Sequence, residues 1–136
     1  MSVTPQIISK ITEYLASNIE PYLIFLFGSF AKGTFREDSD IDIAFLSDKE
    51  CSSYEVFMLA QHLASELGRE VDLVDLKQAS TVFKAQIVGT GKVIYCTDDT
   101  KRMYFQMRAF KDYALLNEER EEILNRIRRR GTVYGG

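Results

Sequence analysis

The sequence has few of the residues from which metal, redox or histidine-based catalytic sites are usually built. Its two cysteines, Cys51 and Cys96, are far apart and form no Cys-x-x-Cys pair, so they indicate neither a disulfide framework nor a zinc site. The single histidine, His62, excludes a histidine-rich metal site and a catalytic pair of histidines. We expect His62 to face solvent or to pack on a helix.

Long apolar runs are also absent. No stretch approaches the roughly 20 residues that a membrane-spanning helix needs. The first residues lack the basic and apolar regions of a signal peptide. We therefore expect a cytoplasmic protein without membrane contact. An excess of positive charge is missing too, because the formal net charge is -3. This charge argues against direct, general nucleic-acid binding, although it leaves room for a local basic patch.

The order of predicted elements indicates an α/β or α+β layered domain. At 136 residues the chain has the length of a single domain, residues 1–136. Within it we expect a core over about 1–97, a helical segment over about 98–130 and a loose tail over 131–136.

Apolar spacing and capping residues place the helices and strands along the chain. We expect helices at 5–18, from Ser52 or Ser53 to Leu67 with Gly68 as the stop, from Ser80 to a break at Gly89–Gly91, and from 97 or 98 to about Arg130 with a candidate break at Leu116–Asn117. We expect strands that end near Phe27, that run from Ile41 to Leu46 and from Glu70 to Leu76, and a short one from Lys92 to Cys96.

Two acids interrupt the second predicted strand, shortly after a turn of small residues. The turn is Gly28-Ser29, and Asp40 and Asp42 follow it. Residues at i and i+2 of a strand point to the same face, so the two carboxylates should lie together. Like charges at this separation repel and raise each other's pKa unless a cation lies between them. Backbone N–H groups at a helix start after such a turn bind phosphate oxygens. The pattern predicts a divalent-metal site beside a phosphate-binding turn.

The third predicted strand carries a further acid at its centre, Asp72. If this strand lies beside the second one, Asp72 completes a cluster of three carboxylates with Asp40 and Asp42, and oxygen clusters of this kind suit Mg²⁺ or Mn²⁺. A solvated position on an edge strand is the simpler alternative for Asp72. Asp75 points to the opposite face by the same parity, and we expect it to be a turn or cap residue.

These residues resemble the polymerase-β-type nucleotidyltransferase superfamily. The resemblance rests on Gly28-Ser29, ten intervening residues, Asp40-x-Asp42 and the later Asp72, and it covers about residues 22–76. The fuller stretches 28–33 and 39–42 resemble the small prokaryotic branch called minimal nucleotidyltransferases. The resemblance implies a small mixed β-sheet flanked by helices, with a C-terminal helical extension.

The resemblance also implies the roles of the site residues. Gly28 and Ser29 would hold the triphosphate of a nucleotide, and Asp40 and Asp42 would bind two metal ions. Asp72 would assist the metal that activates the acceptor and would be the general base. Lys32 stands where relatives often carry arginine, and it is as consistent with a surface lysine as with a phosphate contact. For Arg36 we favour a solvated loop charge over a triphosphate contact.

The acceptor is the open part of the hypothesis. Only about 40 residues follow the fourth strand, too few for a sizeable substrate domain, so a partner macromolecule or a second copy of the chain should present the acceptor. Stand-alone members of this branch resemble the MntA family of antitoxins. The resemblance implies ATP with Mg²⁺ (or Mn²⁺) as donor and a tyrosine of a HEPN-domain toxin as acceptor.

Two other functions fit the same residues. One is a small-molecule nucleotidyltransferase of the aminoglycoside type, with its pocket shared across a homodimer. The other is a non-catalytic antitoxin that blocks its partner by binding. The complete set Asp40, Asp42 and Asp72 argues against the second of these, because a relic site has no need of three carboxylates.

The C-terminal segment carries an apolar stripe and a basic end. Met103, Met107, Phe110 and Ala114 recur at helical spacing, and we expect the stripe to close the core, with a partner-binding face as the alternative. Arg126 and the run 128–130 are typical of a solvated helix end. A contact of these arginines with RNA or an acidic partner is the other interpretation.

Overall fold

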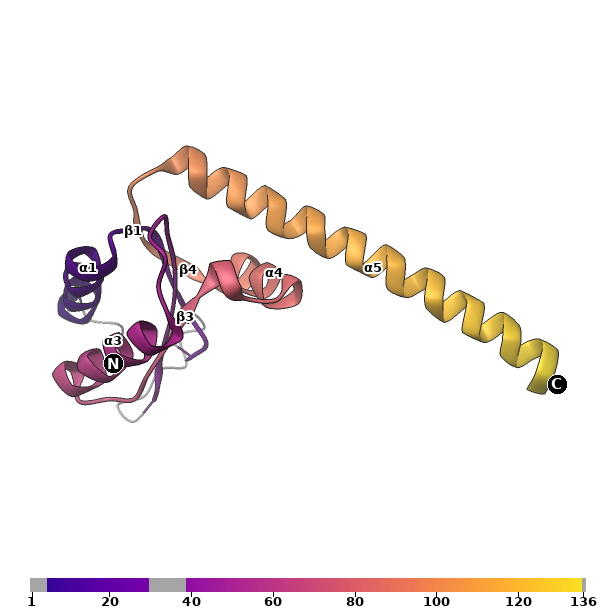
Figure 1. The fold of residues 1–136 in the computed structure, drawn as a ribbon, viewed down its shortest axis with the longest axis horizontal. Helices are drawn as coiled ribbons and strands as arrows, with labels where there is room; N and C mark the ends of the chain where they lie inside the picture. The colour runs from indigo at the N-terminus through magenta and orange to yellow at the C-terminus, as the bar shows by residue number, and fades with distance from the viewer. Residues whose placement is uncertain (1–4, 30–38, 136) are drawn as a thin grey trace.

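The computed structural model describes residues 5–29 and 39–135 and contains every strand that the sequence predicts. The elements are α1 (Pro5–Ile19), β1 (Pro21–Phe27), β2 (Ile41–Ser47), α3 (Ser53–Leu67), β3 (Val71–Asp75), a short 3₁₀ helix (Leu76–Gln78), α4 (Thr81–Thr90), β4 (Lys92–Cys96) and α5 (Asp99–Gly135). Figure 1 shows the sheet between two layers of helices, with α5 projecting far beyond it.

The four strands form one mixed sheet in the order β3-β2-β1-β4. β1 is antiparallel to both β2 and β4, whereas β2 and β3 run parallel. A parallel pair needs a crossover connection, and α3 provides it by packing over β3. The expected α+β fold, a small mixed sheet flanked by helices with a helical extension, is therefore confirmed.

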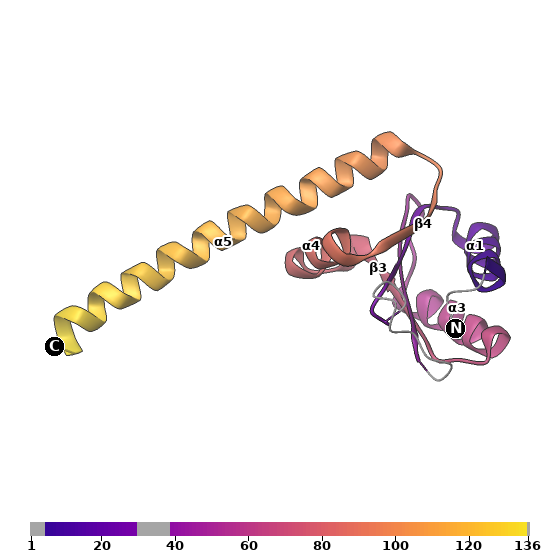
Figure 2. The ribbon, with the colours of Figure 1, turned by 180° about the vertical axis from the view of Figure 1, so that it is seen from behind.

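Alternation along the central strands divides the core into two layers. Ile41, Ile43 and Phe45 of β2 pack beneath α1 and α3. The intervening residues Ala44 and Leu46 pack on the other face, against α4 and the start of α5. Figure 2 shows from behind the helices that cover these two faces, α1 and α3 on one side and α4 on the other. The first residue of β2 on this second face is Asp42, so the face of the sheet that α4 covers ends in an acidic residue.

Local capping rules explain where α3 begins and ends. The side chain of Ser52 accepts a hydrogen bond from the N–H of Glu55 at 3.1 Å, and the Glu55 carboxylate accepts one from the N–H of Ser52 at 3.1 Å. This reciprocal pair is a capping box. Gly68 ends the helix with a φ of +66°, in the left-handed region that glycine adopts without strain. The predicted bounds of this helix are confirmed.

The C-terminal helix differs from the prediction in two respects. α5 is one helix of 37 residues, without a break at Leu116–Asn117. The expected loose tail over 131–136 is wrong for residues 131–135, which are helical; residue 136 lies outside the described part of the chain. No proline interrupts the segment, and good helix formers such as Glu, Leu and Arg fill most of it. The helix therefore continues through the expected break at Leu116–Asn117 and beyond the expected end at about Arg130.

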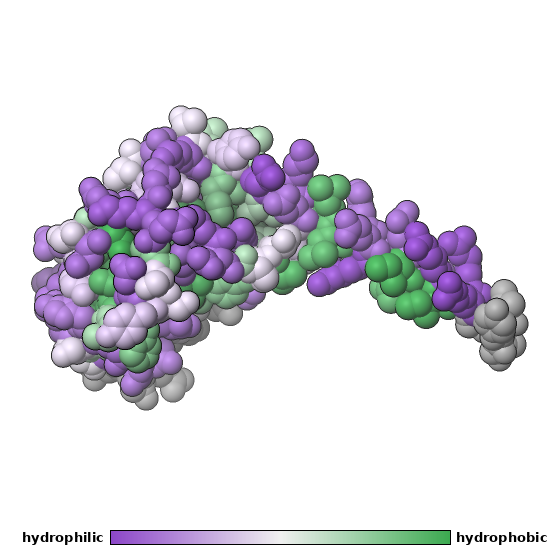
Figure 3. Space-filling view, in the orientation of Figure 1, coloured by the Kyte–Doolittle hydropathy of each residue, from purple (hydrophilic) through white to green (hydrophobic). Residues whose placement is uncertain are grey.

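The second half of α5 projects away from the described core. Its first turns contact α4 and β1, but residues 117–130 are all exposed. Exposed Ile123, Leu124 and Ile127 lie among charged residues on this part of the helix, and Figure 3 shows such apolar patches on the projecting arm. Despite its length, α5 is too polar to cross a membrane, and no other helix of residues 5–29 and 39–135 meets both requirements of length and apolarity.

The capping box should contribute measurably to stability. We expect Ser52→Ala to lower the free energy of unfolding by about 1 kcal/mol, because the first turn of α3 loses a side-chain acceptor. Urea denaturation followed by circular dichroism measures this change. Ser53→Ala, one residue later and outside the cap, is the matched control and should change stability by less. Equal effects of the two substitutions would contradict the role of the cap.

Candidate active site

The parallel pairing of β2 and β3 brings two acids face to face. Asp42 of β2 is the direct register partner of Asp72 of β3, so both side chains leave the same face of the sheet. Asp40 precedes Asp42 by two residues and shares its parity. The N–H of Ile41 donates to the carbonyl of Glu70 at 2.9 Å and fixes this end of the pair. The predicted adjacency of the two acidic strands is confirmed.

The electrostatics of Asp42 show that the three carboxylates interact. Asp42 is half-buried, whereas Asp40 and Asp72 are exposed. Burial raises the pKa of Asp42, and the neighbouring charges of Asp72 and then Asp40 raise it further. The sequence predicted this mutual effect for the pair Asp40 and Asp42. In the structure Asp72 contributes as well, and burial is the largest cause of the raised pKa of Asp42.

Gly28 lies directly against Asp42. Phe27, the last residue of β1, pairs with Asp42 across the antiparallel ladder, and Gly28 then turns the chain with a φ of +67°. A Cβ atom at Gly28 would overlap a carboxylate oxygen of Asp42 and stand 3.1 Å from its Cγ. A side chain here would therefore meet strain in the backbone and a clash with the acid. From the sequence we expected a glycine here because it lets the main chain approach a phosphate. The packing against Asp42 is a second reason for a glycine at position 28.

The turn after Gly28 is described only at its start. Ser29 is half-buried and has helical backbone. The residues after Ser29, among them Lys32 and Arg36, lie outside the described part of the chain. The structure thus brings together Gly28, Ser29, Asp40, Asp42 and Asp72 at one end of the sheet, and the expectation for Lys32 stays a prediction.

The α4 side of this end is closed by an aromatic contact. Phe27 packs edge-on against Phe83 of α4, with ring centroids 5.6 Å apart and an interplanar angle of 86°. Because Phe27 pairs with Asp42, this contact places α4 on the face of the sheet that carries the acids. The opposite side stays open at the exposed Asp40 and Asp72.

The donor set of the cluster fits a hard divalent cation such as Mg²⁺ or Mn²⁺. All three side chains offer carboxylate oxygens. The pKa of Asp42 is raised by burial and then by the charges of Asp72 and Asp40, and a bound cation would offset both effects. In the described part of the chain, no three acidic, histidine or cysteine side chains gather closely enough to chelate an ion by themselves. This agrees with Mg²⁺ sites that use one or two carboxylates together with substrate phosphates.

Asp75 lies apart from the cluster, as its parity predicts. Its side chain accepts a hydrogen bond from the N–H of Lys77 at 3.0 Å and caps the short 3₁₀ helix after β3. Asp75 is buried, with 8% of its surface exposed. The expectation of a turn or cap residue is therefore confirmed, and this acid is not part of the candidate site.

Arg69 is a residue of this end that the sequence did not single out. Its guanidinium donates to the carbonyl of Ser39 at 3.5 Å, directly before Asp40. Asp40 and Arg69 also line one cavity of about 520 Å³ at the end of α3. In the sequence, Arg69 is only a basic residue between the helix stop at Gly68 and the strand that contains Asp72. Such a position is too common to be assigned a role without the fold.

Comparisons with known proteins agree with this geometry. Residues 9–100 match the family model described as polymerase beta, nucleotidyltransferase. The chain is 40% identical over 120 residues to protein adenylyltransferase MntA of Shewanella oneidensis, covering 88% of this chain and 86% of that protein. It is also similar to the crystal structure of a toxin–antitoxin with AMP-PNP, with a TM-score of 0.79, 40% identity, and coverage of 88% of this chain and 97% of the other.

A further similar structure contains a modified partner. It is that of a tri-AMPylated Shewanella oneidensis HEPN toxin in complex with MNT antitoxin. The match has a TM-score of 0.76 and 36% identity, and it covers 90% of this chain and 96% of the other.

The repulsion at Asp42 predicts a stability gain when its charge is removed. Folding raises the pKa of Asp42, so the folded chain binds this proton more tightly than the unfolded chain, and stability falls as the pH rises from 3.8 through the raised value. In metal-free buffer we therefore expect Asp42→Asn to be more stable than the parent near neutral pH. The difference should shrink as the pH falls below 3.8.

Urea denaturation at several pH values measures this difference. Glu13→Gln, which removes an exposed acid from α1, is the control and should show no such gain. Added Mg²⁺ should stabilise the parent and leave Asp42→Asn nearly unchanged, because a ligand stabilises only the state that binds it. A less stable Asp42→Asn at neutral pH would mean that the carboxylate has a favourable partner.

Proposed function

The chain belongs to the polymerase β nucleotidyltransferase family and to its MntA branch, and on this premise we propose that it transfers AMP from ATP to a hydroxyl of a cognate HEPN toxin. One observation carries the proposal: the Gly28 turn packs against Asp42, which faces Asp72 across parallel strands. This contact supports the proposal, because the turn that we propose as the phosphate site lies next to the acids. A tyrosine is the proposed acceptor, and the transfer silences the toxin.

The phosphate end of ATP belongs at the turn. Gly28 offers a main chain without a side chain, and the N–H groups at a helix start bind phosphate oxygens. Ser29 adds a hydroxyl donor, and Lys32 adds a point charge for the triphosphate. ATP is supported as the donor by the AMP-PNP in the similar toxin–antitoxin structure.

Asp40 and Asp42 are the proposed ligands of Mg²⁺ or Mn²⁺, with Asp72 assisting. A bound ion of this kind lowers the pKa of the acceptor hydroxyl and neutralises charge on the departing pyrophosphate. Asp72 is exposed and lies opposite Asp42, so it is accessible to a hydroxyl that approaches from solvent. Asp72 accepts the proton of that hydroxyl as the acceptor oxygen attacks the α-phosphorus.

The projecting part of α5 is the proposed docking element for the toxin. Ile123, Leu124 and Ile127 expose between 48% and 58% of their surface, and no helix or strand of the described chain packs over them. An isolated helix gains little stability from its own hydrogen bonds, so such a surface favours a partner. Two of the similar structures are complexes of an antitoxin with a HEPN or HepT toxin. The stripe at Met103, Met107 and Phe110 is likewise exposed, contrary to the expectation that it closes the core.

Intact mass spectrometry tests the transfer directly. The purified protein is incubated with ATP, Mg²⁺ and the HEPN-type product of the adjacent gene. We expect the partner to gain roughly 329 Da for each AMP transferred. Asp42→Asn should abolish the gain, as should removal of Mg²⁺ by EDTA, whereas Glu13→Gln should leave it unchanged.

The outcomes separate the competing functions. A partner that gains no mass, yet binds tightly to the parent and to Asp42→Asn alike, would replace catalysis with inhibition by binding. Transfer to a hydroxylated small molecule without any partner would instead favour the aminoglycoside-type activity.

The docking role of α5 has a separate test. We expect Ile127→Glu to weaken the complex with the toxin by at least about tenfold, because it places a charge in the buried centre of the contact. Asn125→Glu adds the same charge two positions away, on the opposite side of the helix, and serves as the control. Surface plasmon resonance with immobilised toxin measures both. Equal affinities of the two variants would rule out this face of α5 as the contact.

A further inference from the structure

A second cavity lies at the end of the sheet opposite the acids. It has a volume of about 560 Å³ and is formed by the ends of β1 and β2 together with α4 and the start of α5. Asp48, at its rim, is six residues beyond Asp42 along the chain. At about 3.3 Å per residue the two are roughly 20 Å apart. The cavity is therefore separate from the cluster of Asp40, Asp42 and Asp72.

The lining of this cavity is strongly basic. Among the described residues that line it are four cations, Lys77, Lys84, Lys101 and Arg108, and one acid, Asp48. The whole chain carries a formal net charge of -3. Lys101 pairs with Asp48 and Arg108 with Asp112, so Lys77 and Lys84 carry the net positive charge that would attract an anion.

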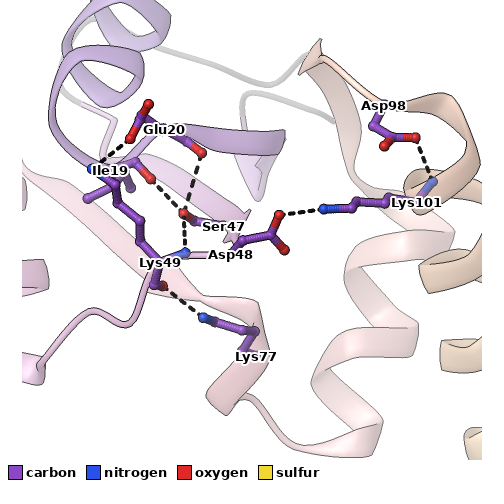
Figure 4. A network of polar contacts seen from close by, with 8 residues as sticks. All are labelled: Ile19, Glu20, Ser47, Asp48, Lys49, Lys77, Asp98 and Lys101. Carbon is purple, nitrogen blue, oxygen red and sulfur yellow. Dashed lines mark hydrogen bonds and ion pairs between the residues drawn. The ribbon is translucent and has the colours of Figure 1, made fainter.

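Within residues 5–29 and 39–135, two of these cations, Lys77 and Lys84, form no ion pair with a carboxylate. Lys101 pairs with Asp48, as Figure 4 shows. Lys77 instead donates from Nζ to the backbone carbonyl of Lys49 at 2.8 Å, a bond that leaves its charge unneutralised. Lys84 is half-buried and forms no ion pair with any acid in the described ranges. An anionic ligand would give these two ammonium groups a charge partner.

Aromatic rings supply the remaining walls. Tyr104 exposes 63% of its surface, and its hydroxyl accepts a hydrogen bond from Nη1 of Arg108 at 3.4 Å. Phe105 and Tyr22 lie beside it in the lining, and the Nζ of Lys101 stands 4.9 Å from the centre of the Tyr22 ring. An exposed ring held by an arginine is a platform on which a planar base can stack.

We propose that this cavity binds a nucleoside phosphate, at a site distinct from the donor site. Its volume lies within the range of about 300–1,000 Å³ typical of ligand pockets. One phosphate monoester carries about 1.5 to 2 negative charges, so a single group balances Lys77 and Lys84. A peptide would need two acidic side chains next to each other to balance the same two lysines. The base then stacks on Tyr104, which an inorganic anion would leave uncovered.

Two sources can supply this chemistry. A nucleoside phosphate occurs as a free nucleotide and as the 5′ end of an RNA strand. Both present a base next to a phosphate monoester, and the cavity is open to solvent at Tyr104. The two sources differ in what lies beyond the first nucleotide, so their relative affinities distinguish them.

Photolabelling locates the site on the full-length chain. The probe is 8-azido-AMP in metal-free buffer, and peptide mass spectrometry maps the label. We expect label on the peptide that contains Tyr104. Lys84→Gln should weaken AMP binding at this peptide about tenfold, and Lys84→Gln with Arg108→Gln about a hundredfold, because each removes a charge-assisted contact. Lys10→Gln with Lys111→Gln, two exposed lysines outside the cavity, is the control and should leave binding unchanged.

Competition assigns the source. A 5′-phosphorylated trinucleotide that displaces the probe better than AMP identifies RNA, and a weaker or equal trinucleotide identifies the free nucleotide. Adenosine should compete at least about tenfold more weakly than AMP, because it lacks the charged group.

The test is independent of the transfer reaction. The Lys84→Gln and Arg108→Gln variant should still adenylylate the toxin at saturating ATP, and Asp42→Asn should still label at Tyr104. Label confined to residues near Gly28, or label at Tyr104 that Lys84→Gln does not reduce, overturns the proposal. Absence of AMP and trinucleotide binding, with weaker toxin binding by the Lys84 variant, would assign the cavity to an acidic surface of the toxin instead.

Discussion

The acidic site depends on the parallel register of β2 and β3. This register places Asp42 opposite Asp72, and a slip of one residue would move every side chain of β3 to the other face. The acids themselves oppose the pairing, because their charges repel. What holds them is the apolar layer on the opposite face, where Ile43 and Leu73 pack beneath α3. Hydrophobic burial on one face of the sheet thus maintains an electrostatically unfavourable arrangement on the other.

The contact between Gly28 and Asp42 links phosphate binding to the same arrangement. Because a Cβ at Gly28 would overlap the carboxylate of Asp42, the turn and the acid occupy adjacent space without a side chain between them. A phosphate held by the turn, as we propose, would lie beside the carboxylate whose pKa is raised by burial and by its acidic neighbours. It would add negative charge next to three acids. A cation would offset this repulsion, which supports the metal-dependent chemistry that we propose.

Local sequence rules predicted most of the fold. Ser52, Gly68 and Ser80 marked helix ends correctly, and period-two parity separated Asp72 from Asp75. His62 stacks on Tyr14 with ring centroids 4.5 Å apart, in agreement with the expected packing role on a helix. These features depend on residues that are near one another in the chain.

The features that the sequence did not predict depend on contacts between distant segments. Burial of Asp42 against Gly28 requires the turn and β2 to meet, and the basic cavity gathers Lys77, Lys84 and Lys101 from three separate elements. The unbroken α5 is a different case, because Asn117 lowers helix propensity too little to end a helix.

The choice of acceptor likewise depends on more than the local motif. In the proposed reaction Gly28 and Ser29 hold phosphate, Asp40 and Asp42 hold the metal, and Asp72 takes a proton that any hydroxyl could supply. We therefore assign the selectivity for one hydroxyl to docking, for which the exposed residues 117–130 of α5 are the proposed contact.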